Sequence, residues 1–181
     1  KSFGRKSVLK GIDLELFPGK AYAIVGENGT GKTTLLNILA GFWKQDKGTI
    51  NISSPIGFCP QEPYLFPNLT VNENLRLFEL AYGINFGPED EKKSEYRESL
   101  IQTFKLSDYG RYHCSKLSEG TRQKLNLVIS LLHDPDLLLL DEPYASFDWD
   151  TYLRFLDFSE NLIKRGKTIL IIAHFIYDKS K

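Results

Sequence analysis

The sequence predicts an α/β fold: a mainly parallel sheet flanked by helices, with a small antiparallel part and an inserted helical subdomain. Apolar, strand-like runs alternate with helix-like runs in the first and last parts of the chain, which is typical of a parallel sheet covered by helices. A glycine-rich loop, residues 26–33, joins one such strand to one such helix. Between residues 70 and 132 the apolar residues follow a helical period, which indicates a helical insertion.

The composition limits the possible functions. Hydrophobic residues make up 41% and charged residues 25% of the 181 residues, as in ordinary water-soluble domains. Lys+Arg and Asp+Glu are both 23, so the formal net charge is zero and no overall field attracts nucleic acid. We therefore expect no nucleic-acid partner. No apolar run approaches the roughly 20 residues that span a bilayer, so membrane contact is expected only through a partner.

Two further features concern the chain as a whole. The two cysteines, Cys59 and Cys114, are far apart and lack metal-ligand spacing, which favours reduced cytosolic thiols. The sequence contains no methionine. We therefore expect a fragment of a longer protein, truncated at both ends.

The first part of the chain combines strands with one helix. Ile12–Leu16 alternates apolar and acidic residues, which predicts a half-buried antiparallel strand. Ala21–Val25 is more uniformly apolar and is expected to be a strand buried on both faces. A predicted helix over Thr34–Ala40 follows, and Gly41 is suited to end it. Two further short strands are predicted at Gly48–Ile52 and Ile56–Cys59.

The middle of the chain is expected to be helical. Thr70 stands three residues before Glu73, which is the spacing of a capping box at a helix start. A loop over Gly83–Gly87 leads to another helix start at Pro88–Glu91, and a long helix is predicted over Arg122–Leu132. Apolar helix faces are predicted at Leu75, Phe78, Leu80 and Ala81, and at Leu100, Ile101, Phe104 and Leu106.

These patterns divide the chain into two units. The core is expected to comprise residues 1–68 plus 133–181, and the helical subdomain residues 69–132. The core resumes with an apolar strand, Leu137–Asp141, and a helix over Trp149–Lys164. Lys167–Ala173 is the last buried strand that the sequence predicts.

The glycine-rich loop carries the strongest functional signal. Residues 26–33 read G-x-x-x-x-G-K-[ST], the phosphate-binding P-loop of nucleotide-hydrolysing proteins. The glycines let the backbone approach a phosphate chain, and the helix dipole favours an anion at the helix start. Lys32 is expected to reach the β- and γ-phosphates, and the Thr33 hydroxyl to bind Mg²⁺. The other residues expected to hold the nucleotide here are Asn28, Gly29, Thr30, Gly31 and Thr34.

Two carboxylates follow the apolar strand of the core. Asp141, at the end of four leucines, is expected to hold Mg²⁺ directly or through water. Glu142 stands beside it and can act as general base on an attacking water. Taken alone, the pair would be an ordinary surface feature, and the P-loop upstream is what favours the metal and base roles.

A polar, glycine-containing stretch, Leu117–Gln123, opens the long helix. Ser118 can cap this helix, and the first N–H groups can face an anion. Taken alone, these residues favour a simple capped helix over an anion-binding site.

The order of these motifs resembles the nucleotide-binding domain of an ATP-binding cassette (ABC) transporter over nearly the whole chain. Its six defining elements have counterparts here: residues 26–33 (Walker A), Gln61 (Q-loop), Leu117–Thr121 (signature LSGGQ), Leu137–Glu142 (Walker B), Ala145–Asp148 (D-loop) and His174 (switch histidine). Walker A alone specifies only a P-loop protein, whereas all six in this order are highly specific.

The resemblance implies a two-subunit ATPase that uses ATP and Mg²⁺. Two such domains bind head to tail, and Ser118 and Gly120 contact the γ-phosphate of the ATP that the other subunit holds. Gln61 contacts Mg²⁺ and the attacking water. It also communicates to a multi-span membrane transport subunit whether ATP is bound. Glu142 activates the water, and His174 hydrogen-bonds the γ-phosphate. The expected location is cytoplasmic, peripheral on the inner face of the cell membrane.

Some positions depart from the family pattern. The signature is LSEGT, in which Glu119 replaces the first glycine and Thr121 the glutamine. A charge at Glu119 near a γ-phosphate is expected to weaken binding across the interface and to slow hydrolysis. Phe147 replaces the usual leucine of the D-loop. Phe3 stands about where the family has an adenine-stacking aromatic, and a loose terminal phenylalanine is an equally good interpretation.

Two other functions compete with transport. A soluble ABC-type ATPase that acts on nucleic acid or ribosomes usually has long coiled-coil insertions or paired cassettes, and the sequence contains neither. A weakly hydrolysing regulatory ATP-binding module is favoured by Glu119, whereas Glu142 and His174 argue against it. A GTPase is not expected, because an NKxD guanine-reading motif is absent.

Overall fold

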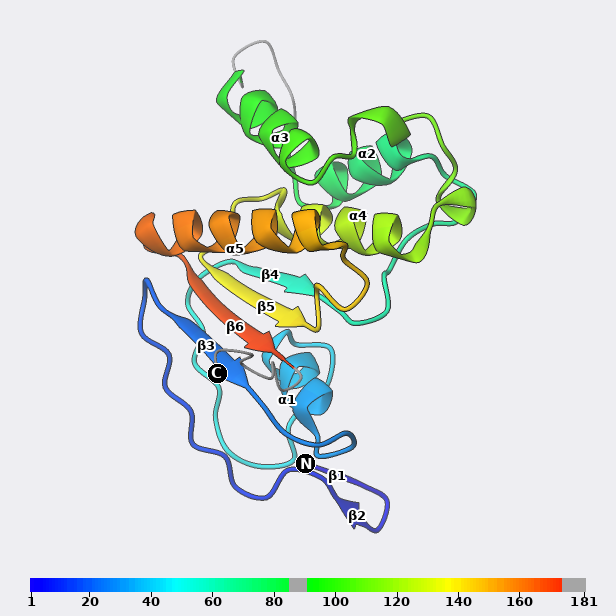
Figure 1. Cartoon of the computed structure of the whole chain (residues 1–181). Coiled ribbons are helices and arrows are strands. Elements are labelled where there is room, and N and C mark those ends of the chain that lie inside the picture. Colours follow the sequence, from blue (N-terminus) through cyan, green and yellow to red (C-terminus); the bar gives the residue numbers. More distant parts are fainter. Residues whose placement is uncertain (85–90, 174–181) are drawn as a thin grey trace, which may run out of the picture.

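Four parallel strands form the central sheet of the protein in a computed structural model that describes residues 1–84 and 91–173 (Figure 1). The strand order is β3 (Ala21–Ile24), β6 (Thr168–Ile172), β5 (Leu137–Asp141) and β4 (Ile56–Cys59). Each neighbouring pair is parallel. The predicted parallel α/β core is therefore confirmed, including the strand that ends in Asp141.

The central strand β5 separates two hydrophobic clusters. All of its residues are buried. Leu138 and Leu140 contribute to the larger cluster, and Leu137 and Leu139 to the smaller one, because successive side chains of a strand point to opposite faces. Strand β5 is therefore buried on both faces of the sheet.

Helices cover both faces of the sheet (Figure 1). Helix α1 (Lys32–Leu39) packs on one face through the fully buried Leu36. Helices α4 (Glu119–Leu131) and α5 (Trp149–Lys164) cover the other face, and the α5 bounds are those predicted. Helix α4 begins three residues earlier than predicted because Ser118 caps it.

The part of the predicted helical subdomain that precedes α4 lies on the outer side of α4 and α5 (Figure 1). It contains α2 (Val71–Ala81) and α3 (Glu91–Thr103), followed by two short 3-10 helices, Ser107–Tyr109 and Cys114–Lys116. The predicted capping box at Thr70 and Glu73 is present at the start of α2. Glu91, the last residue of the predicted helix start at Pro88–Glu91, is the first residue of α3. Residues 88–90 and part of the loop before them lie outside the described residues.

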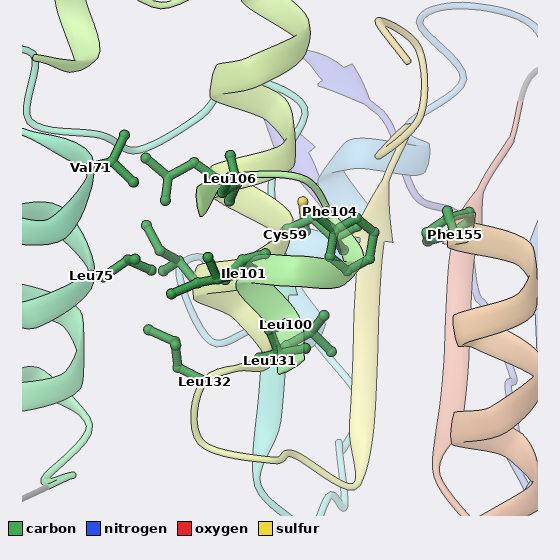
Figure 2. Packing of buried hydrophobic residues seen from close by; sticks show 14 of the residues in the cluster. Cys59, Val71, Leu75, Leu100, Ile101, Phe104, Leu106, Leu131, Leu132 and Phe155 are labelled. Carbon is green, nitrogen blue, oxygen red and sulfur yellow. The ribbon is translucent and has the colours of Figure 1, made fainter. Parts of the chain in front are cut away.

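The packing of α2 and α3 confirms most of the predicted helix faces (Figure 2). Leu75 from α2 and Leu100 from α3 are fully buried, and Phe104 is buried beyond the end of α3. Leu80 and Ala81 are exceptions, because both are exposed, Leu80 to 52%.

Strand β3 differs from its prediction. Among residues 1–84 and 91–173 it pairs only with β6, and it is the edge strand of the sheet that they form. Its residues alternate between exposed and half-buried, and Val25 just after it is 47% exposed. Apolar composition predicted a strand buried on both faces, and this prediction is wrong because composition does not determine where a strand lies in its sheet.

The antiparallel part is also smaller than predicted. It consists of the hairpin of β1 (Ser2–Phe3) and β2 (Lys6–Ser7). The segments Ile12–Leu16 and Gly48–Ile52 are not strands, and among the described residues no backbone partner forms a ladder with them. Alternating polarity can predict a strand face, but a strand also needs a neighbour that satisfies its backbone groups.

Candidate nucleotide-binding site

A cavity of about 580 Å³ lies at the start of α1. It brings together segments that are far apart in the sequence: the β1–β2 hairpin, the glycine-rich loop, and the residues that follow β4 and β5. The lining residues are Phe3, Lys6, Val8, Asn28, Gly29, Gly31, Lys32, Thr33, Thr34, Gln61 and Glu142. Most of the predicted nucleotide-binding residues therefore line one cavity.

Gly31 gives the loop its shape. It is the N-cap of α1 and has φ 98°, in the left-handed region that favours glycine. A Cβ atom at this position would lie 2.7 Å from Val8 Cγ1 and 3.0 Å from Leu9 Cδ2, which is too close. No described side chain caps α1, and its first turn contains no acidic residue. The first N–H groups of the helix are thus available to an anion.

Lys32 places a cation inside the loop. Its Nζ donates to the carbonyl oxygens of Gly26 at 2.8 Å and Glu27 at 2.9 Å. Thr30 Oγ1 donates to the same Glu27 oxygen at 2.8 Å. The loop therefore curls around the ammonium group, where a phosphate that binds the helix start would meet a positive charge.

Gln61 and Glu142 meet because they follow neighbouring strands. Cys59 of β4 pairs with Leu140 of β5, and each functional residue comes two positions later. Gln61 Nε2 donates a hydrogen bond to Glu142 Oε2 at 3.1 Å. Asn126 of α4 donates to the carbonyl oxygen of Pro60 at 2.9 Å, which fixes the backbone just before Gln61.

Glu142 has an unusual backbone conformation for a non-glycine residue. Its φ is 50°, in the left-handed region. Its N–H donates to the Ile172 carbonyl at 3.2 Å, and its own carbonyl accepts from the N–H of Ala145 at 3.2 Å. Such conformations cost energy and are concentrated at functional sites, where the surrounding structure holds them.

The residues predicted to hold Mg²⁺ carry the oxygen ligands that this ion prefers, although Asp141 does not line the cavity. Thr33 and Gln61 line the cavity, and Asp141 is 1% exposed at the end of β5. The described residues contain no group of three or more His, Cys, Asp or Glu side chains that could hold a metal. Mg²⁺ with a nucleotide does not need such a cage, because phosphate oxygens and water complete its coordination.

Phe3 lies on the cavity wall. Its ring packs edge-on against Trp43, with 5.4 Å between the ring centroids. The backbone N–H of Ser2 donates to Asp46, and hydrogen bonds from Lys1 and Ser2 lower the pKa of that carboxyl. These contacts hold Phe3 beside the cavity, and its stacking on adenine stays a prediction.

Ser118 and Gly120 lie at a different place, the start of α4. Ser118 Oγ accepts from the N–H of Thr121 at 3.2 Å, so the capping role expected from sequence physics is present. A Cβ on Gly120 would lie 2.6 Å from the Ser146 carbonyl oxygen, so only glycine fits there. Neither residue lines the cavity that contains Lys32.

Not every predicted site residue lines the cavity, and two residues that were not predicted do. His174 lies outside the described residues, and Thr30 is in the loop but does not line the cavity. Lys6 and Val8 line the cavity although the sequence analysis did not select them. Lys6 lies beside the cavity because it pairs with Phe3 in the β1–β2 hairpin. The sequence alone does not show this pairing.

Both cysteines are free and buried, in agreement with the prediction of reduced thiols. Burial raises the pKa of the Cys59 thiol, and the nearby Asp141 charge raises it further. Cys59 is therefore a protonated thiol that packs in the larger hydrophobic cluster, two residues before Gln61.

A glycine-rich loop between a parallel strand and an uncapped helix, with acidic residues at the end of another strand of the same sheet, defines a P-loop nucleotide-binding protein. The protein belongs to the ABC transporter family, because the family model described as "ABC transporter" matches residues 9–145.

Relatives in several organisms support this assignment. The chain is 33% identical to an ABC transporter ATP-binding protein of Methanocaldococcus jannaschii, covering 96% of this chain and 65% of that protein. It is 32% identical to Nod factor export ATP-binding protein I of Paraburkholderia xenovorans, covering 100% of this chain and 62% of that protein. The aliphatic sulfonates import protein SsuB of Corynebacterium glutamicum is 35% identical, with 96% and 70% covered. The chain thus spans less than two thirds of the first two relatives.

Solved structures share the fold. A dimeric bacterial ABC transporter cassette superposes with a TM-score of 0.85 at 25% identity, covering 96% of this chain and 84% of that chain. A post-hydrolysis dimer of an ATP-binding cassette bound to ADP and Pi superposes with a TM-score of 0.84 at 25% identity, covering 97% and 84%. Within the described parts of the chain, no helix is long and apolar enough to cross a membrane.

Proposed function

We propose that this chain binds and hydrolyses ATP as the energy-supplying subunit of a transporter. The observation that carries the proposal is the single cavity at the start of α1, which is lined by Lys32, Thr33, Gln61 and Glu142 together. A phosphate-binding cation, a Mg²⁺ ligand and a candidate general base at one place suit phosphoryl transfer to water.

Each residue has a role in the proposed reaction. The N–H groups of the first turn of α1 and Lys32 bind the phosphates and neutralise their charge. Thr33, Gln61 and Asp141 would hold Mg²⁺, which supplies charge neutralisation on the phosphate oxygens when bound. Glu142 takes a proton from the attacking water, and the hydrogen bond from Gln61 orients its carboxylate.

The proposed active form is a head-to-tail pair of such domains. Ser118 and Gly120 open α4 away from the cavity, so they cannot serve the nucleotide of their own chain in this arrangement. The N-terminus of α4 would instead receive the γ-phosphate of ATP bound by a second nucleotide-binding domain. His174 is proposed to contact the γ-phosphate, as the family pattern implies.

A surface beside the Gln61 segment is suited to a membrane-bound partner. Phe42, Tyr64 and Phe66 are 58%, 58% and 50% exposed. The rings of Phe42 and Tyr64 are in contact, with centroids 6.3 Å apart. Clustered exposed aromatic residues mark protein interaction sites. We propose that a multi-span transport subunit binds here, which would place the chain at the inner face of the cell membrane.

Phosphate release by the full-length protein tests the proposal. We expect Glu142→Gln to lower the rate of ATP hydrolysis by a factor of roughly 100 to 10,000, the range for a lost general base. Nucleotide affinity should persist, because the phosphate-binding groups remain. Glu98→Gln, an exposed change on α3, is the matched control and should leave the rate unchanged. Hydrolysis at the wild-type rate by the Glu142→Gln variant would contradict the role of Glu142.

A further inference from the structure

Glu119 makes a contact that its position in the signature does not predict. It is the first residue of α4, directly after the cap Ser118. Ser146 Oγ donates a hydrogen bond to Glu119 Oε1 at 2.9 Å. Ser146 belongs to the loop between β5 and α5, which is 27 residues away in the sequence. The start of α4 is thus tied to the loop that begins at Glu142.

The next residue of α4 touches the same place in a different way. Gly120 lies so close to Ser146 that an added Cβ would be 2.6 Å from the Ser146 carbonyl oxygen. This contact involves backbone and does not depend on the Glu119 side chain. Two adjacent residues of α4 therefore pack against one residue of the loop.

The loop is short and held at both ends. At its start, Glu142 has φ 50° and its carbonyl accepts from the N–H of Ala145 at 3.2 Å. At its end, Asp148 caps α5 by accepting from the N–H of Thr151 at 2.9 Å. Ser146, which contacts the start of α4, lies between these two fixed ends. A movement of the first turn of α4 would consequently be transmitted to the segment that carries Glu142.

We infer that Glu119 and Ser146 are positioning residues that couple the start of α4 to the catalytic Glu142 of the same chain. The inference rests on the proposed function, in which α4 serves the partner's ATP and Glu142 serves the chain's own ATP. The hydrogen bond then links the two ATP sites of a dimer through a single chain. A glycine at position 119 would have no side chain to make this link, so the link belongs to the LSEGT sequence of this chain.

A double-mutant cycle in the full-length protein tests the coupling. The variants are Glu119→Ala, Ser146→Ala and the double variant, with Glu119→Gln as the conservative change because its amide oxygen can still accept from Ser146. The matched controls are Glu98→Ala and Ser99→Ala on α3, where an exposed glutamate and an exposed serine also make hydrogen bonds. The measurements are kcat and KM for ATP, the Hill coefficient, and the thermal unfolding temperature.

We expect each single alanine variant to lower kcat about fivefold, the effect of one lost hydrogen bond on positioning. The Hill coefficient for ATP should fall in both, and the double variant should be no slower than either single variant. KM should stay within about twofold, since the groups that bind ATP in the same chain remain. Glu119→Gln should be no slower than the wild type, because its acceptor oxygen remains and a charge that disfavours a phosphate is removed. The two controls should keep the wild-type kcat, and the unfolding temperature should fall by a similar small amount in test and control alanine variants, since each loses one hydrogen bond.

Several results would overturn the inference. One is a Ser146→Ala variant with wild-type kcat. Another is a double variant whose fold loss of kcat equals the product of the losses in the two single variants. A Glu119→Gln variant as slow as Glu119→Ala would assign the effect to the charge instead of the hydrogen bond. In each case an active wild-type protein leaves the proposed function intact. A wild type that does not hydrolyse ATP would remove both the proposed function and the coupling.

Discussion

The two helix starts that the proposal assigns to phosphate binding are built differently. Helix α1 begins after Gly31, no described side chain caps it, and its first turn has no acidic residue. Helix α4 begins after Ser118, whose side chain caps it, and Glu119 stands in its first turn. An uncapped helix start offers more unpaired N–H groups and a more favourable field to an anion.

This difference separates the roles of the two helices. The start of α1, together with Lys32, is equipped to bind the phosphates of a nucleotide within one chain. The start of α4 already satisfies part of its own hydrogen-bonding need through Ser118 and carries a negative charge. We therefore expect α1 to determine nucleotide affinity and α4 to contribute only when two chains associate.

Lys32→Ala should produce the largest loss of nucleotide affinity. It removes a charged donor to the phosphates, and hydrogen bonds of charged groups are worth about 1.5 to 3 kcal/mol, which corresponds to roughly 10- to 150-fold in affinity. Equilibrium titration with a fluorescent ATP analogue measures it. The control is Lys10→Ala, an exposed lysine outside the cavity lining. Unchanged affinity of the Lys32→Ala variant would break the distinction between the two helix starts.

Gly31→Ala should also weaken nucleotide binding, through the shape of the loop. The new Cβ meets Val8, and φ 98° disfavours alanine by about 1 to 2 kcal/mol. Gly41→Ala is a matched control, because Gly41 has φ +82° but no atom within 4 Å of an added Cβ. Both variants should lose some thermal stability, and only Gly31→Ala should lose ATP affinity in titration. Equal affinity in the two variants would refute the role of the close contact.

Ser118→Ala should have the smallest effect on a single chain. Loss of the cap costs about 1 kcal/mol of stability, as it does for Thr70→Ala at the start of α2. Urea unfolding should thus show similar losses for the two variants, with ATP affinity of the monomer unchanged. ATP-dependent association should weaken only in Ser118→Ala. If Thr70→Ala weakens association as much, the special role of the α4 start is wrong.

Local sequence patterns predicted the elements that are determined by a few neighbouring residues. The capping box at Thr70, the leucine run of β5 and the glycine-rich loop belong to this class, because caps, buried strands and tight turns depend on neighbouring residues. The family resemblance implied that Gln61 and Glu142 both act at the attacking water, whereas their hydrogen bond is explained by the pairing of β4 with β5.

Features that depend on the sheet order could not be predicted. Within the described part of the chain, β3 lies at a sheet edge and Ile12–Leu16 forms no ladder. Both features depend on which segments lie side by side, which composition does not encode. The contact of Glu119 with Ser146 likewise requires the placement of α4 against the loop after β5. The sequence marked Glu119 as unusual, whereas only the structure gives its partner.

The central claim is that one chain holds only half of each ATP site, with the γ-phosphate bridging two chains. Sedimentation of the Glu142→Gln variant with saturating ATP and Mg²⁺ tests it most directly, because this change slows hydrolysis and keeps the γ-phosphate in place. The account predicts a dimer with ATP, a monomer with ADP, and a monomer for the Lys32→Ala/Glu142→Gln double variant under both conditions. A Glu142→Gln protein that binds ATP and stays monomeric would contradict the account.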